Sequence, residues 1–380
     1  MTTTINNEQK KLNVPNLRFP EFQGEWKEER LADIADLYKG TGISKDQLSD
    51  DGEPCILYGE LYTKYKSETI REVISKTNID NTKLVRSKAN DVIIPCSGET
   101  AEDIATARCV LNGNILLGGD LNIIRLHRYD GTFMSYQLNG RRKYDIAKVA
   151  QGVSVVHLYG EHLKGVKTIN PCLEEQKKIA SLLALLDERI TTQNKIIDKL
   201  QSLIKGISQK IVRFNKPNAR LSECLVCKSS TLQESDVYEQ GTYPVYGANG
   251  IVGYLDNYNT EGEAVYIIKD GSGVGTVSYV TGKCSATGTL NTLQAKEGYS
   301  LQYLYYLLKV FNFEPYKTGM AIPHIYFKDY GKAKVFCPSY TEQLRYARLL
   351  SAIDNKLSIE QNILTELRLQ KQYLLRQMFI

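Results

Sequence analysis

The feature that most constrains the fold of this chain is a long helical pattern that occurs twice. Residues 170–212 align without gaps on residues 337–379, so that each residue has a counterpart 167 positions later. Pro171 in this way aligns with Pro338. In both copies apolar residues recur at alternating steps of three and four, which is the spacing of an amphipathic helix. The gapless alignment argues against two unrelated core helices, and the sequence predicts two related long ones.

An apolar seam of this length requires a partner helix. At 1.5 Å per residue, about forty residues form a rod of about 60 Å. Each seam carries one polar residue near its middle, Gln193 in the first copy and Glu360 in the second. If the helices pair antiparallel, these two side chains meet and fix the register; a solvent-exposed edge position is the alternative. The predicted seam residues are Ile179, Leu183, Leu186, Ile190, Gln193, Ile197, Leu200, Leu350, Ile353, Leu357, Glu360, Leu364 and Leu367.

The segments that precede the two helices are related as well. The pattern Gly-x4-His-x-Tyr begins at Gly152 and again at Gly319, at the same offset of 167. Farther upstream the offset grows to 188, between Tyr58 and Tyr246, which predicts an insertion between Gly59 and Val92. We therefore predict an α+β protein built by direct duplication. In it two mixed α/β domains, here called heads, alternate with two long spacer helices that pair as an antiparallel coiled coil with pseudo-twofold symmetry. The predicted parts are an N-terminal arm (1–24), head 1 (25–169), a central spacer helix (170–215), head 2 (216–336) and a C-terminal spacer helix (337–380).

Within each head, short runs of β-branched and aromatic residues lie between Gly, Asn and Asp turns, which indicates strands. In head 1 the predicted strands are Cys55–Tyr58, Val92–Ile94, Thr106–Leu111, Ile115–Leu117 and Leu121–Leu126, followed by a helix over Phe133–Arg142. In head 2 they are Pro244–Tyr246, Ala264–Ile268, Gly275–Val280 and Thr289–Gln294, followed by a helix near Leu301–Phe311. In the arm, Leu17, Phe19 and Phe22 are candidate anchors for an extended segment docked on the rest of the chain.

Charge alone gives little support to nucleic-acid binding. The net charge is +5, yet residues 25–170 carry 20 basic and 21 acidic residues, and residues 216–336 carry 11 of each. A basic face on either head must therefore come from spatial clustering. No apolar run has the length of a membrane span, and the N-terminus lacks the apolar core of a signal peptide, so we expect a cytoplasmic protein without a membrane partner. The scattered cysteines, including the lone pair Cys224 and Cys227, predict free thiols.

The motifs of catalysis are missing from the sequence. The stretch Gly271–Gly275 follows a strand but precedes another strand pattern, so it lacks the helix N-terminus of a phosphate-binding loop and predicts a tight turn. Residues 170–173 (Asn-Pro-Cys-Leu) are similar to the Asn-Pro-Pro-aromatic loop of amino-methyltransferases, but the aromatic residue is missing and the segment favours a helix start. His157 and His324 recur without a nucleophile or base nearby, which favours a structural hydrogen bond. We expect neither a catalytic residue nor a metal site.

The alternation of variable domain and long helix resembles the DNA-specificity subunit of Type I restriction–modification systems. The arm Val14–Phe22 followed by Trp26, the Pro-x-x-x-Glu-Gln helix entries at Pro171 and Pro338, and the stretch Tyr243–Leu255 are all similar to that family. The resemblance covers nearly the whole chain. It implies that each head recognises one half of a split target in double-stranded DNA. It also implies that two copies of a methyltransferase subunit and the restriction–translocase subunits assemble on the chain, and that S-adenosylmethionine, ATP and Mg²⁺ act in those partners while this chain is non-catalytic.

Recognition of bases needs donors and acceptors on loops, and recognition of phosphates needs basic side chains. The candidates in head 1 are Lys64, Lys66, Arg86, Arg108, Arg141, Arg142 and Lys143. The candidates in head 2 are Tyr246, Asn249, Lys269, Ser272 and Lys283. For each of them a solvated surface position is the alternative. At the level of the whole chain, the alternative function is a two-headed coiled-coil adaptor that binds proteins rather than DNA.

Overall fold

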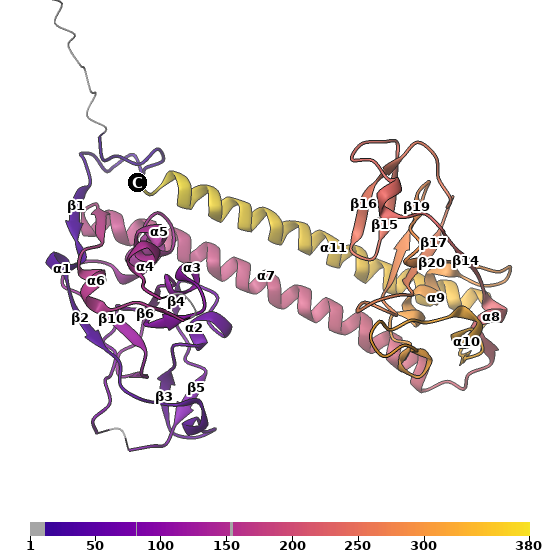
Figure 1. Ribbon diagram of the computed structural model, residues 1–380, viewed down its shortest axis with the longest axis horizontal. Coiled ribbons are helices and arrows are strands. Elements are labelled where there is room, and N and C mark those ends of the chain that lie inside the picture. The colour runs from indigo at the N-terminus through magenta and orange to yellow at the C-terminus, as the bar shows by residue number, and fades with distance from the viewer. Residues whose placement is uncertain (1–11, 81, 153–154) are drawn as a thin grey trace, which may run out of the picture. The chain divides into compact units, whose positions relative to one another are not determined.

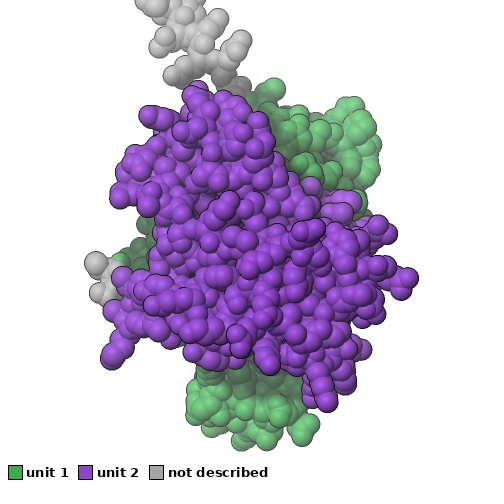
Figure 2. All heavy atoms as spheres, turned by 90° about the vertical axis from the view of Figure 1, so that its right-hand side faces the viewer, with its two compact units in different colours: residues 1–192, 364–380 green, residues 193–363 purple. Residues whose placement is uncertain are grey.

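The computed structural model describes residues 12–80, 82–152 and 155–380 and divides the chain into two compact units. Unit 1 consists of Met1–Thr192 and Leu364–Ile380, and unit 2 consists of Gln193–Ile363. Figure 1 shows the elements, and Figure 2 colours the two units. The two long helices α7 (Leu173–Arg213) and α11 (Tyr340–Gln377) each continue from one unit into the other. Each unit therefore contains one head together with a segment of both spacer helices.

Both spacer helices begin with the features expected at a helix N-terminus. Pro171 lies just before α7, and Glu174 and Glu175 occupy its first turn, where carboxylates complement the helix dipole. Before α11, the Ser339 hydroxyl and the Glu342 carboxylate hydrogen-bond each other and the backbone amides of these two residues. Both helices start three residues later than predicted. In the first case this is because the preceding strand runs to Asn170.

Unit 1 carries a mixed sheet at the centre of head 1. Its elements are β1 (Lys27–Arg30), α1 (Leu31–Ile34), β2 (Ala35–Lys39), η1 (Lys45–Gln47), β3 (Glu53–Ile56), α2 (Glu60–Thr63), β4 (Thr69–Ile70), β5 (Ser75–Thr77), β6 (Asp91–Pro95), β7 (Ser97–Gly98), α3 (Ala101–Ile104), β8 (Arg108–Val110), β9 (Leu116–Leu117), β10 (Leu121–Leu126), α4 (Gly131–Asn139), α5 (Lys143–Val149), β11 (Val156–His157), α6 (Gly160–Lys164) and β12 (Lys167–Asn170).

The main sheet of head 1 has the order β2-β10-β6-β8-β4, with β10 antiparallel to both of its neighbours. Strand β6 is buried on both faces because its side chains alternate between two cores. Val92 and Ile94 pack with Met134 and Leu138 of α4, whereas Ile93 packs on the opposite side. The first and last strands of the head, β1 and β12, pair antiparallel and bring the two ends of the head together.

Unit 2 repeats this plan in a shorter form. Its elements are β13 (Ala219–Arg220), α8 (Leu221–Cys224), β14 (Leu225–Ser229), η2 (Glu234–Asp236), β15 (Tyr243–Gly247), β16 (Gly250–Leu255), β17 (Ala264–Ile268), β18 (Val277–Val280), β19 (Ser285–Ala286), β20 (Leu290–Ala295), α9 (Leu301–Leu308), η3 (Glu314–Tyr316), α10 (Phe327–Tyr330) and β21 (Lys334–Val335).

The sheet order β14-β20-β17-β18 corresponds to β2-β10-β6-β8 of unit 1. The terminal strands β13 and β21 pair as β1 and β12 do. A second sheet, β16-β15-β19, lies beside the main one. It corresponds to the sheet β5-β3-β9 of unit 1. The additional α2 and β4 of unit 1 fall between Gly59 and Val92, the interval in which the offset predicts an insertion.

The predicted elements of the heads agree with the structure in type and differ at their ends. Strands β10 and β17 have the predicted bounds. The helices are shorter than predicted, since α4 ends at Asn139 and α9 at Leu308. Strand β3 begins two residues earlier than predicted and ends at Ile56, because Leu57 and Tyr58 accept the first hydrogen bonds of the α2 turn.

Candidate nucleic-acid interface

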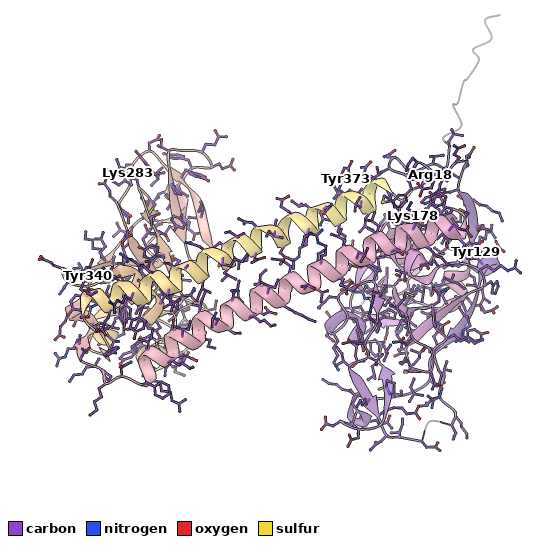
Figure 3. All side chains as sticks on the ribbon, turned by 180° about the vertical axis from the view of Figure 1, so that it is seen from behind. Arg18, Tyr129, Lys178, Lys283, Tyr340 and Tyr373 are labelled. Atoms are coloured by element: carbon purple, nitrogen blue, oxygen red, sulfur yellow. The ribbon has the colours of Figure 1, made fainter. Side chains whose placement is uncertain are left out.

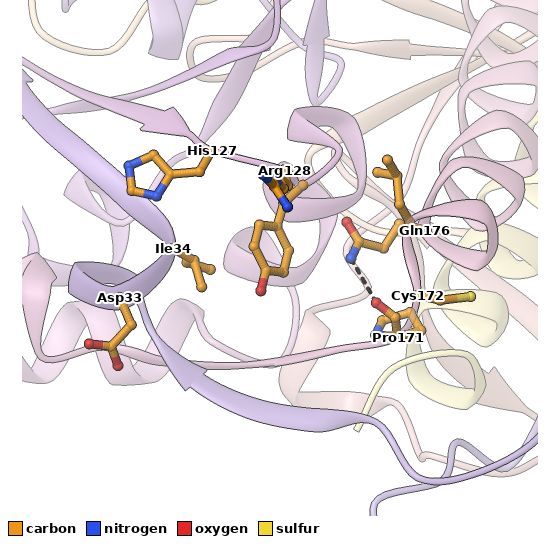
Figure 4. A pocket seen from close by; sticks show the side chains of 9 residues that line it. Asp33, Ile34, His127, Arg128, Pro171, Cys172 and Gln176 are labelled. Atoms are coloured by element: carbon orange, nitrogen blue, oxygen red, sulfur yellow. Dashed lines mark hydrogen bonds between the residues drawn. The ribbon is translucent and has the colours of Figure 1, made fainter.

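Head 1 is attached to its spacer helix through two polar side chains of α7. The Gln176 Oε1 atom accepts a hydrogen bond from the Asp130 amide at 2.9 Å, and its Nε2 atom donates to the Pro171 carbonyl at 2.9 Å (Figure 4). Farther along α7, the Asp187 carboxylate accepts a hydrogen bond from the Tyr136 hydroxyl of α4 at 2.6 Å. Burial, together with the neighbouring Asp187 carboxylate, raises the pKa of Tyr136, so its hydroxyl remains a donor.

Head 2 repeats these contacts with the residues that lie 167 positions later on the spacer. Gln343 accepts from the Ser300 amide at 2.9 Å and donates to the Pro338 carbonyl at 2.9 Å. Tyr306 of α9 donates to Asp354 at 3.2 Å. The duplicated glutamine and aspartate therefore hold each head in the same way.

The described part of the arm docks within unit 1, as the sequence predicts, but the predicted anchor Leu17 is exposed. Arg18 forms a two-pronged ion pair with Glu175, with distances of 2.8 Å from Nε and 2.7 Å from Nη2. Phe19 packs against the cluster that contains Trp26, and Lys178 of α7 lies 4.5 Å above its ring. Figure 3 labels Arg18 and Lys178 beside the N-terminal end of α7. The arm thereby covers the place where α7 begins and α11 ends.

The seam residues line the contact between the two spacer helices within each unit. In unit 1, Ile179, Leu183 and Leu186 of α7 and Leu364 and Leu367 of α11 are buried. In unit 2, Gln193, Ile197, Leu350, Leu357 and Glu360 are buried. The remaining seam residues, Ile190 of unit 1 and Leu200 and Ile353 of unit 2, are partly exposed.

The two polar seam residues meet, as an antiparallel pairing requires. Gln193 Nε2 donates to the Glu360 carbonyl at 3.0 Å and also contacts the Glu360 carboxylate. Lys356, one helical turn before Glu360, forms an ion pair with the same carboxylate. The Lys356 ammonium and the Gln193 amide together lower the pKa of Glu360, so this carboxylate is held in its charged form.

Most of the predicted contact residues of head 1 already have partners inside the unit. Lys64 contacts Glu60 and Ser75, and Lys66 donates to the Tyr62 carbonyl. Arg86 forms an ion pair with Glu53. Arg108 is largely buried and donates to the carbonyls of Tyr65 and Ala107, and burial lowers its pKa.

The basic run at the start of α5 faces the end of the chain. Arg141 donates to the Arg376 carbonyl at 2.7 Å, and Arg142 contacts both Asp145 and the Ile380 carbonyl. Lys143 is the first residue of α5 and is partly exposed. The structure thus brings Arg141 and Arg142 to the C-terminal end of the chain beyond α11.

In head 2 the structure gathers four of the five candidates at one end of the sheets, here called the loop end. Tyr246 and Asn249 lie where β15 turns into β16, and the Tyr246 carbonyl accepts from the Thr287 amide. The backbone amide of Lys269 donates to Thr289, which ties the loop that contains Lys269 and Ser272 to the same end. Asn249 and Ser272 are exposed, whereas Tyr246 is half-buried against Tyr266.

Lys283 lies at the other end of the small sheet. Strands β15 and β19 are parallel, and Lys283 precedes β19, so it lies near Tyr243 at the start of β15. Its ammonium is 4.8 Å from the centre of the Tyr258 ring and 3.8 Å from Glu261. A groove beside it is lined by polar residues that the sequence reasoning missed, among them Ser230, Asn257 and Asn259. No motif marks these residues, because the groove forms only when β14, β16 and β19 assemble.

The glycine stretch and the two histidines behave as the sequence predicts. Gly271 and Gly275 adopt positive φ, and the next element is strand β18. His324 exchanges backbone hydrogen bonds with Thr318, and its Nδ1 atom lies 2.6 Å from Asp270. His157 makes the same backbone exchange with Gln151. Both histidines therefore make the same paired backbone contact in their head.

The cysteines are all unpaired, and Cys224 lies opposite Cys337, at a sulfur–sulfur distance of 3.5 Å, rather than Cys227. Over residues 12–80, 82–152 and 155–380, no cluster of His, Cys, Asp and Glu has an arrangement suited to a metal ion. Within the same ranges, no helix has both the length and the apolar character needed to cross a membrane.

Comparison with known proteins agrees with this architecture. The chain is 28% identical over 116 residues to the specificity subunit of the Type I restriction enzyme EcoprrI of Escherichia coli, which covers 30% of this chain and 29% of the relative. It is 27% identical over 196 residues to the MjaVIII specificity subunit of Methanocaldococcus jannaschii, which covers 51% of this chain and 43% of the relative. The chain thus spans less than half the length of these curated relatives.

Solved structures share the fold. The S subunit of a Type I restriction–modification system from M. genitalium superposes with a TM-score of 0.71 at 19% identity, covering 97% of this chain and 99% of that one. A chain from a structure of Type I system assembly and conformational transition gives 0.51 at 16% identity, covering 93% and 97%. The family model described as the Type I restriction modification DNA specificity domain matches residues 23–202 and again residues 221–369. Because these two matches cover both heads and most of each spacer helix, the chain belongs to the Type I restriction–modification DNA specificity family.

Proposed function

We propose that this chain is the subunit that selects DNA for a Type I restriction–modification complex. Each head reads one half of a bipartite target in double-stranded DNA. The observation that carries the proposal is the duplication of head and spacer contacts, in which Gln176 and Asp187 hold head 1 as Gln343 and Asp354 hold head 2. Two readers held in equivalent ways but built from different loops suit two half-sites of different sequence.

The chemistry in this proposal belongs to partners. Two copies of a methyltransferase subunit and the restriction–translocase subunits assemble on the chain, and they use S-adenosylmethionine, ATP and Mg²⁺. The chain itself is non-catalytic. Purified alone and supplied with all three compounds, it neither methylates nor cleaves DNA. Activity that copurifies with this chain in the absence of a second polypeptide would contradict this.

Exchange of one head tests the reading of half-sites. Residues 25–169 are replaced by the same region of a homologue, and methylated adenines are mapped in cells that also carry the cognate methyltransferase subunit. One half of the methylated motif changes and the other stays. The reciprocal exchange of residues 216–336 is the matched control and changes the opposite half. A change of both halves in either exchange means that the heads are not independent readers.

The competing function, a two-headed adaptor for proteins, predicts a different response to salt. A chain that neutralises DNA phosphates releases counterions, so its affinity for DNA falls steeply as salt rises. Retention of the full chain on a target duplex at increasing salt separates the two functions. An adaptor shows no salt-dependent retention.

A further inference from the structure

Each head presents an exposed strip of three alternating residues that consists of an aliphatic side chain, a histidine and a tyrosine. In head 1 the strip is Val155, His157 and Tyr159. Val155 and Tyr159 are each 53% exposed, and the His157 and Tyr159 rings stack at an angle of 24°. The residues between them, Val156 and Leu158, are buried in the head. The strip therefore faces solvent along an extended segment.

Head 2 carries the same strip 167 positions later, formed by Ile322, His324 and Tyr326. Ile322 is 58% exposed and Tyr326 is 48% exposed, and the two rings stack at an angle of 20°. Ile325, between them, is buried. The duplication thus extends from the spacer helices to this one exposed surface.

The backbone holds both strips in the same way. His157 and Gln151 exchange two hydrogen bonds, and the Leu158 amide donates to Cys96 at 2.8 Å. His324 and Thr318 exchange the same pair, and the Ile325 amide donates to Lys269 at 2.9 Å. The residues under the strips differ between the heads. The strips are therefore equivalent surfaces in surroundings that have diverged.

An exposed aliphatic side chain and an exposed tyrosine contribute little to the folding of a head. Their presence at the same position in both heads therefore indicates a ligand that both heads bind. Base reading does not supply one, because two heads that read different half-sites need different contacts. A phosphate site common to both heads does not fit either, since neither strip contains Lys or Arg and Asp270 lies 2.6 Å from His324. The Lys328 ammonium lies 5.3 Å from the centre of the Tyr326 ring, but its counterpart in head 1 is Glu161. Tyrosine is enriched at the centre of protein–protein interfaces, where charged residues are depleted.

We propose that the two strips are docking surfaces for two copies of one protein, the methyltransferase subunit. This inference rests on the proposed function, in which a half-site beside each head is modified by its own copy of that subunit. Equivalent strips on equivalent heads place the two copies in the same orientation relative to their half-sites. Tyr159 and Tyr326 are the central contacts.

The test uses the full chain and its purified cognate methyltransferase subunit. One variant carries Val155→Ser and Tyr159→Ser, a second carries Ile322→Ser and Tyr326→Ser, and a third carries all four changes. Titration calorimetry gives the number of subunits bound and the affinity of each site. We expect each of the first two variants to weaken one of two sites by about tenfold or more, as for interface centres. The third variant weakens both sites.

Matched controls are Tyr144→Ser in head 1 and Tyr238→Ser in head 2, which alter tyrosines that are 66% and 69% exposed but lie outside the strips. Both controls keep two sites of unchanged affinity. Affinity of the isolated chain for target DNA stays unchanged in every variant. Two intact sites in the four-residue variant overturn the proposal. Loss of DNA affinity with intact subunit binding assigns the strips to DNA and also overturns it. An unmodified chain that binds no methyltransferase subunit counts against the proposed function itself.

Discussion

Asp187 and Asp354 occupy matching positions on the two spacer helices, but the lysine that pairs with each of them comes from a different element. In unit 1, Lys371 of α11 lies 2.6 Å from both Asp187 and Glu68. In unit 2 the residue in register with Lys371 is Ile204, and Lys309 from the end of α9 lies 4.0 Å from Asp354. Burial opposes the charge of Lys371, but the two carboxylates outweigh it and raise the pKa of its ammonium.

Substitution of Lys371 by Met should destabilise unit 1, because it leaves the buried Asp187 and the partly buried Glu68 without their cation. Loss of one partner of a buried ion pair costs about 3–5 kcal/mol. Because the pKa of Lys371 is raised on folding, its contribution is present below the ordinary lysine pKa and is lost only as pH rises through the raised value.

The single tryptophan, Trp26, is buried in unit 1, and its fluorescence reports the unfolding of that unit in urea. Ile204→Met in unit 2 is the matched control and should leave the Trp26 transition in place. An unchanged midpoint for Lys371→Met at neutral pH would mean that the ion cluster contributes nothing to unit 1.

The Gln193–Glu360 pair makes a different prediction, because both partners can be removed together. Gln193→Leu alone leaves the Glu360 carboxylate without its amide donor and should lower the melting temperature. The double variant Gln193→Leu with Glu360→Leu completes the apolar seam and should melt at or above the wild-type temperature. Thermal melts followed by circular dichroism measure both. Equal losses in the single and double variants would contradict this interpretation.

Acid should lower the stability of the wild-type chain relative to the double variant. The pKa of Glu360 is lowered on folding, so its contribution is present above the ordinary glutamate pKa. It is lost as pH falls through the lowered folded value.

Among the elements, the duplication repeats the contact between each head helix and its spacer helix. Helix α4 meets α7 through Tyr136 and Asp187, and α9 meets α11 through Tyr306 and Asp354. The aspartates stand at the same register of the two spacers, and the tyrosines occupy corresponding sites on the head helices. These contacts hold each head at a defined position along its spacer.

Tyr136→Phe removes one hydrogen bond to a charged group, which is worth about 1.5–3 kcal/mol. Faster hydrogen exchange is expected in α4 (Gly131–Asn139), with α9 (Leu301–Leu308) unchanged. Tyr306→Phe should give the reverse, and each variant is the control for the other. Mass spectrometry of peptic fragments measures the exchange. Equal acceleration of both helices in either variant would show that the contacts are not local.

For the whole molecule, the proposed function makes specificity depend on distance as well as on base contacts. Four residues inserted in α7 near Gly206 add about 6 Å and slightly more than one turn. The apolar seam keeps nearly the same direction, while one head moves outward. Base pairs follow one another at about 3.4 Å, so the preferred gap between half-sites should lengthen by about one or two base pairs.

Mapping of methylated adenines measures both the gap and the half-sites. We expect the sequences of the two half-sites to stay the same while the gap lengthens. A three-residue insertion is the matched control, because it rotates the seam farther out of phase and should cost more stability. An unaltered gap in a folded, active complex with the four-residue insertion would mean that the helices do not set the spacing.

Local and repetitive features of this protein are determined by the sequence alone. The gapless repeat predicts both spacer helices and the meeting of Gln193 with Glu360, because helical periodicity and register depend only on spacing along the chain. The interval that contains the head 1 insertion is predicted from the change in offset between the two repeats, from 167 to 188 residues. The sequence predicts the bounds of short elements such as α9 less well, since the end of a helix depends on which backbone carbonyls accept hydrogen bonds from outside the helix.

The placement of charged side chains is decided only by the tertiary structure. Arg108 and Lys371 look like any exposed basic residue in the sequence, yet one donates to buried carbonyls and the other joins two carboxylates. The loop end of head 2 likewise joins segments that are far apart along the chain. A side chain's burial and partners depend on long-range packing, which a single sequence does not encode in any local pattern.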